Sequence, residues 1–397
     1  RKGRRGEEER RRGASGQHPF ACATLNHVAQ PVKINTFHCP ASPPCSSPSL
    51  LPPIPRHFPS PPPTAKTHLP ATRRTSLPET TSNSVAMTHS KFTEQDIPDL
   101  TGYIAIVTGG NGGIGYETTK QLALRNARVY IASRSAPRVQ EAIEKMKSEA
   151  GKNLDLHFLQ IDLQDLKSVK AAANNFPEER LDILINNAGV MNVPYKLTGD
   201  GYETQWQVNY LAPHMFTTGL LPKLLSTAAA SGDKNRVRVV HVTSDLANNA
   251  PGAPKTINFE DPNLSNLTGT FALMQRYAHS KQAIVRDAVE INNRYSAQGV
   301  TAYAVHPGIV STGLQGSDTT WLGFVIRNMA KIVSRTTPLQ GSYNSLFAAT
   351  SPSAASLQGK FLLPVGIVEK RSESSWLTEK TVNADLWNKT EELAKKF

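Results

Sequence analysis

The chain has 397 residues and a formal net charge of +12, and its composition changes abruptly near residue 87. Residues 1–86 hold 15 of the 28 prolines, all three cysteines, and twelve Lys and Arg against four Asp and Glu. The remaining 87–397 has no cysteine, which excludes thiol and cysteine-based metal chemistry there and suits a protein of a reducing, cytoplasmic compartment. No apolar run reaches the ~18 residues that a membrane span needs, so we expect no integral membrane contact.

Residues 1–86 consist of basic and proline-rich runs such as RKGRRGEEERRR and PPIP, without sustained apolar periodicity. Such a segment cannot bury enough apolar surface to fold, which predicts a disordered extension. Three interpretations stay open: an extension without function, a ligand for nucleic acid, membranes or polyproline-binding domains, and a segment that precedes the true start. Met87 is the first methionine and stands just before a folded-looking segment, which favours the third interpretation.

From residue 103 onward, short β-branched apolar runs alternate with segments of helix length. Such runs predict seven parallel strands covered by helices on both faces. The sequence therefore indicates a doubly wound, Rossmann-type α/β fold in a single domain, 87–397, with ligands at the carboxyl ends of the strands. The predicted strands are YIAIVTG (103–109), ARVYIAS (127–133), LHFLQID (156–162), LDILINN (181–187), RVRVVHVTS (236–244), VTAYAVHPG (300–308) and KFLLPVGIV (360–368).

The first predicted strand runs into TGGNGGIG and then into a helix. Glycines at this point permit a tight turn and let a pyrophosphate approach the backbone N–H groups at the positive end of the helix. An ordinary flexible turn is the alternative, but the position at the first strand-to-helix connection favours a dinucleotide. The residues assigned to the cofactor here are Thr108, Gly109, Gly113, Ile114 and Gly115.

The second predicted strand ends in Ser133-Arg134, where a site that prefers NAD would carry Asp or Glu to hold the ribose 2′-OH. Arg134, aided by Arg138, can instead form charge-assisted hydrogen bonds to a 2′-phosphate, so NADP(H) is preferred over NAD(H). A solvated surface arginine is the alternative. After the third strand, Asp162-Leu163 is expected to meet the adenine edge, or else to form a plain turn.

Four motifs in order give the chain a family resemblance. They are the TGxxxGIG turn at 108–115, NNAG (186–189), Tyr277-x-x-x-Lys281 and HPGIVST (306–312). Together they resemble the short-chain dehydrogenase/reductase family over roughly residues 100–370, and the segment 197–216 is similar to its retinol-dehydrogenase-like branch. The resemblance implies an NAD(P)-dependent oxidoreductase that acts on a carbonyl or an alcohol.

The resemblance also assigns residues. Asn209 in QVNYLA, Ser244 in VVHVTSDLA, Tyr277 and Lys281 match the family's catalytic set. Thr243 is a weaker substitute for Ser244, and Asp245 departs from the family pattern, which leaves the local charge open. Residues that would line the cofactor are Asn187, Ala188, Gly189, Tyr277, Lys281, Pro307, Gly308, Val310 and Thr312.

The chemistry asks for a proton donor to a developing alkoxide. A free tyrosine has a pKa of about 10, and a lysine one helical turn away is expected to lower it toward neutrality. Ser244 can hydrogen-bond the same substrate oxygen. In the family, the lysine also bonds the nicotinamide ribose and the asparagine holds a water; these roles come from the resemblance alone.

The segments expected around the substrate are apolar, among them Val190-Met191 and WLGFVI (321–326), which favours a hydrophobic aldehyde, ketone or alcohol. For WLGFVI, a core or interface helix is an equal alternative. A non-catalytic NADP-binding sensor or scaffold on the same fold competes with the enzyme. His279 and His306 are expected to be structural, no zinc-ligand spacing is present, and the sequence is compatible with a homo-oligomer.

Overall fold

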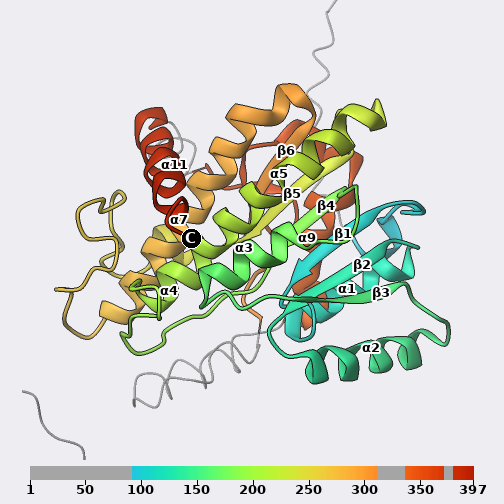
Figure 1. Cartoon of the computed structure of the whole chain (residues 1–397), viewed down its shortest axis with the longest axis horizontal. Coiled ribbons are helices and arrows are strands. Elements are labelled where there is room, and N and C mark those ends of the chain that lie inside the picture. Colours follow the sequence, from blue (N-terminus) through green and yellow to red (C-terminus); the bar gives the residue numbers. More distant parts are fainter. Residues whose placement is uncertain (1–91, 311–335, 371–378) are drawn as a thin grey trace, which may run out of the picture. The chain divides into compact units, whose positions relative to one another are not determined.

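The computed structural model describes residues 92–310, 336–370 and 379–397, all within one compact unit, 82–397. Its centre is a sheet with the strand order β3-β2-β1-β4-β5-β6-β7-β8 (Figure 1). The first seven strands are parallel, and β8 pairs with β7 in the antiparallel direction. The bounds are β1 (Ile104–Thr108), β2 (Arg128–Ser133), β3 (Leu156–Gln160), β4 (Ile183–Asn186), β5 (Val237–Val242), β6 (Val300–Val305), β7 (Phe361–Leu363) and β8 (Ile367–Val368).

The predicted doubly wound parallel sheet is confirmed, with one difference at its last strand. The run 360–368 forms β7 and then β8 rather than a single strand. Pro364 offers no N–H for a ladder, and Gly366 takes a φ of +71°, so the chain turns between the two. The extension predicted for 1–86 lies outside the described residues.

Helices cover both faces of the sheet. The helices are α1 (Gly113–Leu124), α2 (Ala136–Ala150), α3 (Leu166–Asn174), α4 (Thr204–Trp206), α5 (Ala212–Ser231), α6 (Leu246–Asn249), α7 (Ala272–Tyr295), α9 (Pro338–Thr350) and α11 (Lys380–Ala394). One hydrophobic core contains residues of α3, α5, α7 and α11, and the other contains residues of α1, α2 and α9. Neighbouring strand residues alternate between them, as Ile106 and Val107 do, because successive side chains point to opposite faces.

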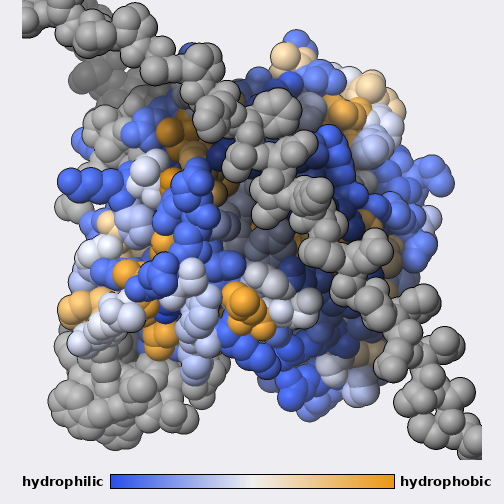
Figure 2. All heavy atoms as spheres, turned by 60° about the vertical axis from the view of Figure 1, so that its left-hand side comes forward, coloured by the Kyte–Doolittle hydropathy of each residue, from blue (hydrophilic) through white to orange (hydrophobic). Residues whose placement is uncertain are grey.

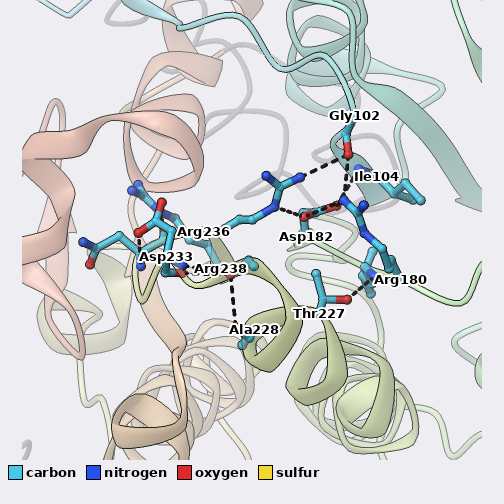
Figure 3. A network of polar contacts seen from close by, with 12 residues as sticks. Gly102, Ile104, Arg180, Asp182, Thr227, Ala228, Asp233, Arg236 and Arg238 are labelled. Carbon is cyan, nitrogen blue, oxygen red and sulfur yellow. Dashed lines mark hydrogen bonds and ion pairs between the residues drawn. The ribbon is translucent and has the colours of Figure 1, made fainter.

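The buried carboxylate of Asp182 links the chain segments at the amino ends of β1 and β4 (Figure 3). Asp182 precedes β4, accepts a hydrogen bond of 2.9 Å from Ile104 N at the start of β1, and forms an ion pair with Arg236. Arg180 and Arg236 both donate to Gly102 O. These contacts fix the register of β1 and β4 at the end of the sheet opposite the glycine turn, so this cluster serves the fold.

Few large apolar side chains are exposed in the part of the chain that the structure describes. On the face shown in Figure 2, hydrophobic residues form small groups among hydrophilic ones. Among the described residues, no helix combines the length and the apolar character needed to cross a membrane. The exposed large apolar residues are Tyr195, Leu197, Phe271, Ile309 and Ile367.

Candidate active site

The glycine turn between β1 and α1 has the shape that a dinucleotide needs. Gly109 and Gly113 have φ values of +65° and +55°, a region that favours glycine. A methyl group added at Gly115 would lie 2.5 Å from Asn187 Nδ2 and against Gly109 O. The N-cap of α1 is Gly112, which has no side chain to accept from the first turn, so the N–H groups there remain suited to a phosphate.

The ends of β1 and β4 are joined by two hydrogen bonds. Asn187 Nδ2 donates to Thr108 O at 2.8 Å, and Ala188 N donates to Thr108 Oγ1 at 2.9 Å. The two strands are neighbours at the point where the chain order reverses, which is where ligands bind in open α/β sheets. The structure therefore brings the TG and NNAG motifs together.

Gly189 lies beside two residues of the predicted catalytic set. A methyl group there would lie 3.0 Å from Asn209 Oδ1 and 3.4 Å from Lys281 Nζ. The NNAG segment therefore borders both the glycine turn and the catalytic residues.

Asn209 lies in a π-helical turn, Gln207–Leu211, between α4 and α5. Its Oδ1 accepts from Val190 N at 2.8 Å, and its Nδ2 donates to Val190 O at 2.9 Å and to Ser280 Oγ at 3.0 Å. Such turns recur at functional sites because they re-aim side chains. The sequence prediction missed both the turn and Ser280; the serine that precedes Lys281 was the available signal for the second.

Tyr277 and Lys281 lie one turn apart on α7, buried beneath the end of β5. The Ser244 side chain lies close enough to the Tyr277 hydroxyl to lower the pKa of Tyr277. Lys281 Nζ donates to Val242 O at 2.9 Å and lies 5.7 Å from the centre of the Tyr277 ring. The structure thus brings together all four residues of the predicted set, Asn209, Ser244, Tyr277 and Lys281.

Burial controls the protonation of this pair. Burial raises the pKa of Tyr277 to about 12, although the Ser244 side chain opposes the rise. Burial also lowers the pKa of Lys281 from 10.5 to about 7. The expected lowering of the tyrosine pKa by the lysine is absent here, because desolvation disfavours both charged forms.

The neighbours of the catalytic set have structural partners. Thr243 Oγ1 donates to Lys281 O at 3.0 Å, which leaves Ser244 as the hydroxyl directed at Tyr277. The backbone of Asp245 starts α6, and its carboxylate opposes the lowering of the His306 pKa by burial. His279 stacks on Trp206 with ring centres 4.6 Å apart and accepts from a backbone N–H.

The residues predicted for the adenosine side lie at the ends of β2 and β3. Arg134 and Arg138 are exposed, and neither makes an ion pair within the described part of the chain. Asp162 Oδ1 accepts from Gln164 N at 3.0 Å, and Leu163 is buried. Arg134 therefore has room for a ligand, while Asp162 already takes part in the turn before α3.

The segment after β6 returns to the glycine turn. Gly308 has a φ of +86°, and Val310 pairs with Thr336 in an isolated bridge. A methyl group at Gly341 of α9 would lie 2.6 Å from Val310 and 3.2 Å from Ile114. Val310 thus lies near the start of α1, and Gly308 lies beside Pro364. Thr312 and WLGFVI lie outside the described residues. In the same described ranges, no group of three His, Cys, Asp or Glu could hold a metal.

Known proteins of similar sequence include short-chain dehydrogenases. A family model described as short chain dehydrogenase matches residues 103–254. The chain is 40% identical to an uncharacterized oxidoreductase of Schizosaccharomyces pombe over 73% of this chain and 86% of that protein. It is 39% identical to the short-chain dehydrogenase/reductase drtF of Aspergillus calidoustus, over 76% of this chain and 96% of that protein.

Two further similarities concern the branch and the fold. Retinol dehydrogenase 12 of Mus musculus is 35% identical over 74% of this chain and 87% of its own length. A crystal structure of an uncharacterized protein from Mycobacterium Paratuberculosis superimposes with a TM-score of 0.56 and 28% identity, over 77% of this chain and 97% of that one.

Proposed function

This chain belongs to the short-chain dehydrogenase/reductase family, in its retinol-dehydrogenase-like branch, and from that premise we propose that it is an NADP(H)-dependent reductase of hydrophobic aldehydes or ketones. Its class, an NAD(P)-dependent oxidoreductase acting on a carbonyl or an alcohol, follows from the family. The observation that carries the finer proposal is the buried pair of Tyr277 and Lys281 on α7, with Lys281 Nζ 5.7 Å from the centre of the tyrosine ring and the Ser244 side chain acting on the tyrosine hydroxyl.

The residues present fit a dinucleotide. The uncapped first turn of α1 would hold the pyrophosphate, and Gly115 leaves the space for its approach. Asn187, Ala188 and Gly189 would line the middle of the site, and Pro307, Gly308 and Val310 its far side. When bound, NADP(H) supplies or receives the hydride.

The chain's own residues would handle the proton. Tyr277 with a pKa of about 12 is a neutral phenol at pH 7, which is the form that can donate a proton to an alkoxide. Ser244 would hydrogen-bond the same substrate oxygen and orient it toward Tyr277 Oη. Lys281, with a pKa of about 7, can return a proton to the tyrosine side of the site. Asn209 would hold the backbone of Val190 and the position of Ser280 beside that lysine.

Arg134 supports the preference for NADP(H). It follows β2 directly, is exposed, and makes no ion pair among the described residues. No carboxylate occupies the tip of β2, where NAD-selective sites bind the ribose hydroxyl. A guanidinium at this place matches the geometry and charge of a 2′-phosphate.

The substrate class is supported by the loops at the carboxyl ends of the strands. Among the residues that the structure describes, four of the five exposed large apolar residues lie there, after β4, β5 and β6. They are Tyr195, Leu197, Phe271 and Ile309. Apolar side chains around the mouth of a site favour a hydrophobic substrate, and a relative of this chain carries the name retinol dehydrogenase.

The test measures NADPH consumption with a panel of apolar aldehydes and ketones, including a polyene aldehyde, by wild type and Tyr277→Phe. Loss of the proton donor is expected to lower kcat about 10²- to 10⁴-fold, with NADPH affinity and melting temperature little changed. Tyr103→Phe, which removes a hydroxyl just before β1 at the end of the sheet opposite the site, is the control. Equal turnover by wild type and Tyr277→Phe would refute the assignment. NADPH binding without any turnover by wild type would favour a non-catalytic sensor.

A further inference from the structure

A buried ionic cluster lies further along α7 than the catalytic pair, and it has no place in the reaction described above. Asp287 of α7 lies between two histidines, with Oδ1 2.6 Å from His214 Nδ1 and Oδ2 3.2 Å from His241 Nε2. His214 belongs to α5 and His241 to β5, and all three side chains are buried. His214 Nε2 also lies 3.0 Å from Glu391 Oε1 of α11.

The partners of His214 fix its protonation state. Both ring nitrogens face carboxylate oxygens, which only accept hydrogen bonds, so both nitrogens must carry protons. Burial opposes this charge, but Asp287 and Glu391 outweigh burial and raise the pKa of His214 to about 9. The ring is therefore an imidazolium that bridges α7 and α11.

The partners of His241 fix its tautomer. Thr217 Oγ1 donates to Pro213 O, so it accepts from Asn186 Nδ2. The same amide nitrogen lies 3.2 Å from His241 Nδ1 and gives it the other proton. His241 Nδ1 is therefore the acceptor, and Nε2 carries the proton that faces Asp287.

These contacts bear on catalysis through the register of α7 against β5. Three consecutive residues of β5 and its end contact the helix. His241 pairs with Asp287, Val242 O accepts from Lys281 Nζ at 2.9 Å, and Thr243 Oγ1 donates to Lys281 O at 3.0 Å. A shift of α7 along the strand that broke the first contact would also displace the catalytic amine.

We propose that His214 is a positioning residue: as an imidazolium between Asp287 and Glu391, it holds the catalytic helix in register on β5 and makes that register depend on the docking of the C-terminal helix. The inference rests on the proposed reductase function for its kinetic readout. Other contacts hold α11 on the same surface: Arg286 of α7 pairs with Glu379, and Tyr210 hydrogen-bonds Thr390.

The proposal has a defined pH dependence. The titratable groups that face His214 are Asp287 from α7, Glu391 from α11 and Tyr210 from the preceding turn, with His241 of β5 beyond Asp287. Because the folded pKa of His214 is raised from 6.5 to about 9, its contribution is complete below pH 6.5 and is lost as the pH rises through about 9. Removal of one carboxylate lowers that upper limit.

The test compares wild type with Glu391→Gln, which keeps an acceptor oxygen but removes a charge at a partly exposed position. Histidine-selective ¹⁵N NMR between pH 6 and 10 follows the two ring nitrogens of His214. NADPH dissociation constants and kcat/KM are measured over the same range. We expect His214 to carry two protons at pH 7, and its titration and the alkaline fall of both profiles to move down by about one pH unit in the variant.

Glu392→Gln is the matched control, since it removes the same charge from the same helix at a residue that pairs with Lys395. A single proton on His214 at pH 7 would overturn the proposal. The proposal would also be overturned if the His214 titration shifted in Glu391→Gln while the pH profiles of NADPH dissociation and of kcat/KM stayed unchanged. The cluster would then have a structural role only. If wild type shows no turnover, the reductase assignment fails, and the NADPH binding profile alone decides the role of His214.

Discussion

Replacement of Lys281 by methionine should abolish activity and yet stabilise the protein. Methionine has a similar length and no charge, so it can fill the space without the cost of a buried amine. Lys281 is buried, and its Nζ has one hydrogen bond, to Val242 O. The perturbation therefore separates what the residue does for chemistry from what it costs the fold.

The magnitude follows from the shift of the lysine pKa from 10.5 to about 7. At 1.36 kcal/mol per pKa unit, desolvation of the charged lysine destabilises the wild-type fold by roughly 4 to 5 kcal/mol. The methionine variant avoids this cost but loses the hydrogen bond to Val242, which reduces its advantage by about 1 kcal/mol. Below pH 7 the folded state carries this cost in full. Between pH 7 and 10.5 the unfolded state binds the extra proton, so the stability of wild type rises with pH, and above 10.5 no cost remains.

The assay is urea unfolding followed by circular dichroism at pH 7, 8.5 and 10. Lys281→Met is expected to be more stable than wild type by about 3 kcal/mol at pH 7, with the advantage shrinking toward pH 10.5. Lys167→Met, at an exposed position of α3, is the control and should show no such trend. Equal stability of Lys281→Met and wild type at pH 7, or an advantage of the variant that persists at pH 10, would contradict a cost of burying the charged amine.

Two further predictions concern the cofactor. Gly115→Ala places a methyl group 2.5 Å from Asn187 Nδ2, so we expect a loss of about 1–3 kcal/mol in stability and NADPH binding weakened roughly 5- to 100-fold; Gly112→Ala, which meets no atom within 4 Å, should keep the wild-type melting temperature. Arg134→Ala should weaken NADPH binding about 10- to 100-fold and leave NADH binding and stability unchanged, as measured by fluorescence titration; equal losses for both cofactors would contradict a 2′-phosphate contact.

The order of the elements was readable from the sequence because burial on both faces leaves a simple signature in parallel strands. The runs 236–244 and 300–308 contain the whole of β5 and β6. The last run, 360–368, was harder to interpret, since it contains enough apolar residues for one strand and its turn depends on Pro364 and Gly366. A two-residue edge strand such as β8 leaves too short a pattern to recognise.

The candidate site was readable only in part. A motif that directly follows a predicted parallel strand must lie at the carboxyl edge of the sheet. The motifs TGxxxGIG, NNAG and Tyr277-x-x-x-Lys281 could therefore be expected to lie close together. The hydrogen bond from Asn209 to Ser280 depends on a π-helical turn, and no local sequence pattern predicts such a turn. The protonation of Tyr277 and Lys281 could not be predicted from their spacing, because it depends on how deeply α7 is buried.

Helix α7 contains both the buried Lys281, which destabilises the fold, and Asp287, whose contacts can offset that destabilisation. A neutral or partly charged amine gives α7 little attraction to β5, since the acceptor of Lys281 Nζ within the described ranges is one carbonyl oxygen, that of Val242. Asp287, less than two turns further along, forms an ion pair with the imidazolium of His214 and lies 3.2 Å from His241 Nε2 of β5. The position of α7, which carries the buried Lys281, therefore depends on the ion pair between Asp287 and His214 outside the site. For this reason the charge of His214 should affect kcat/KM of the reaction in which Tyr277 donates the proton.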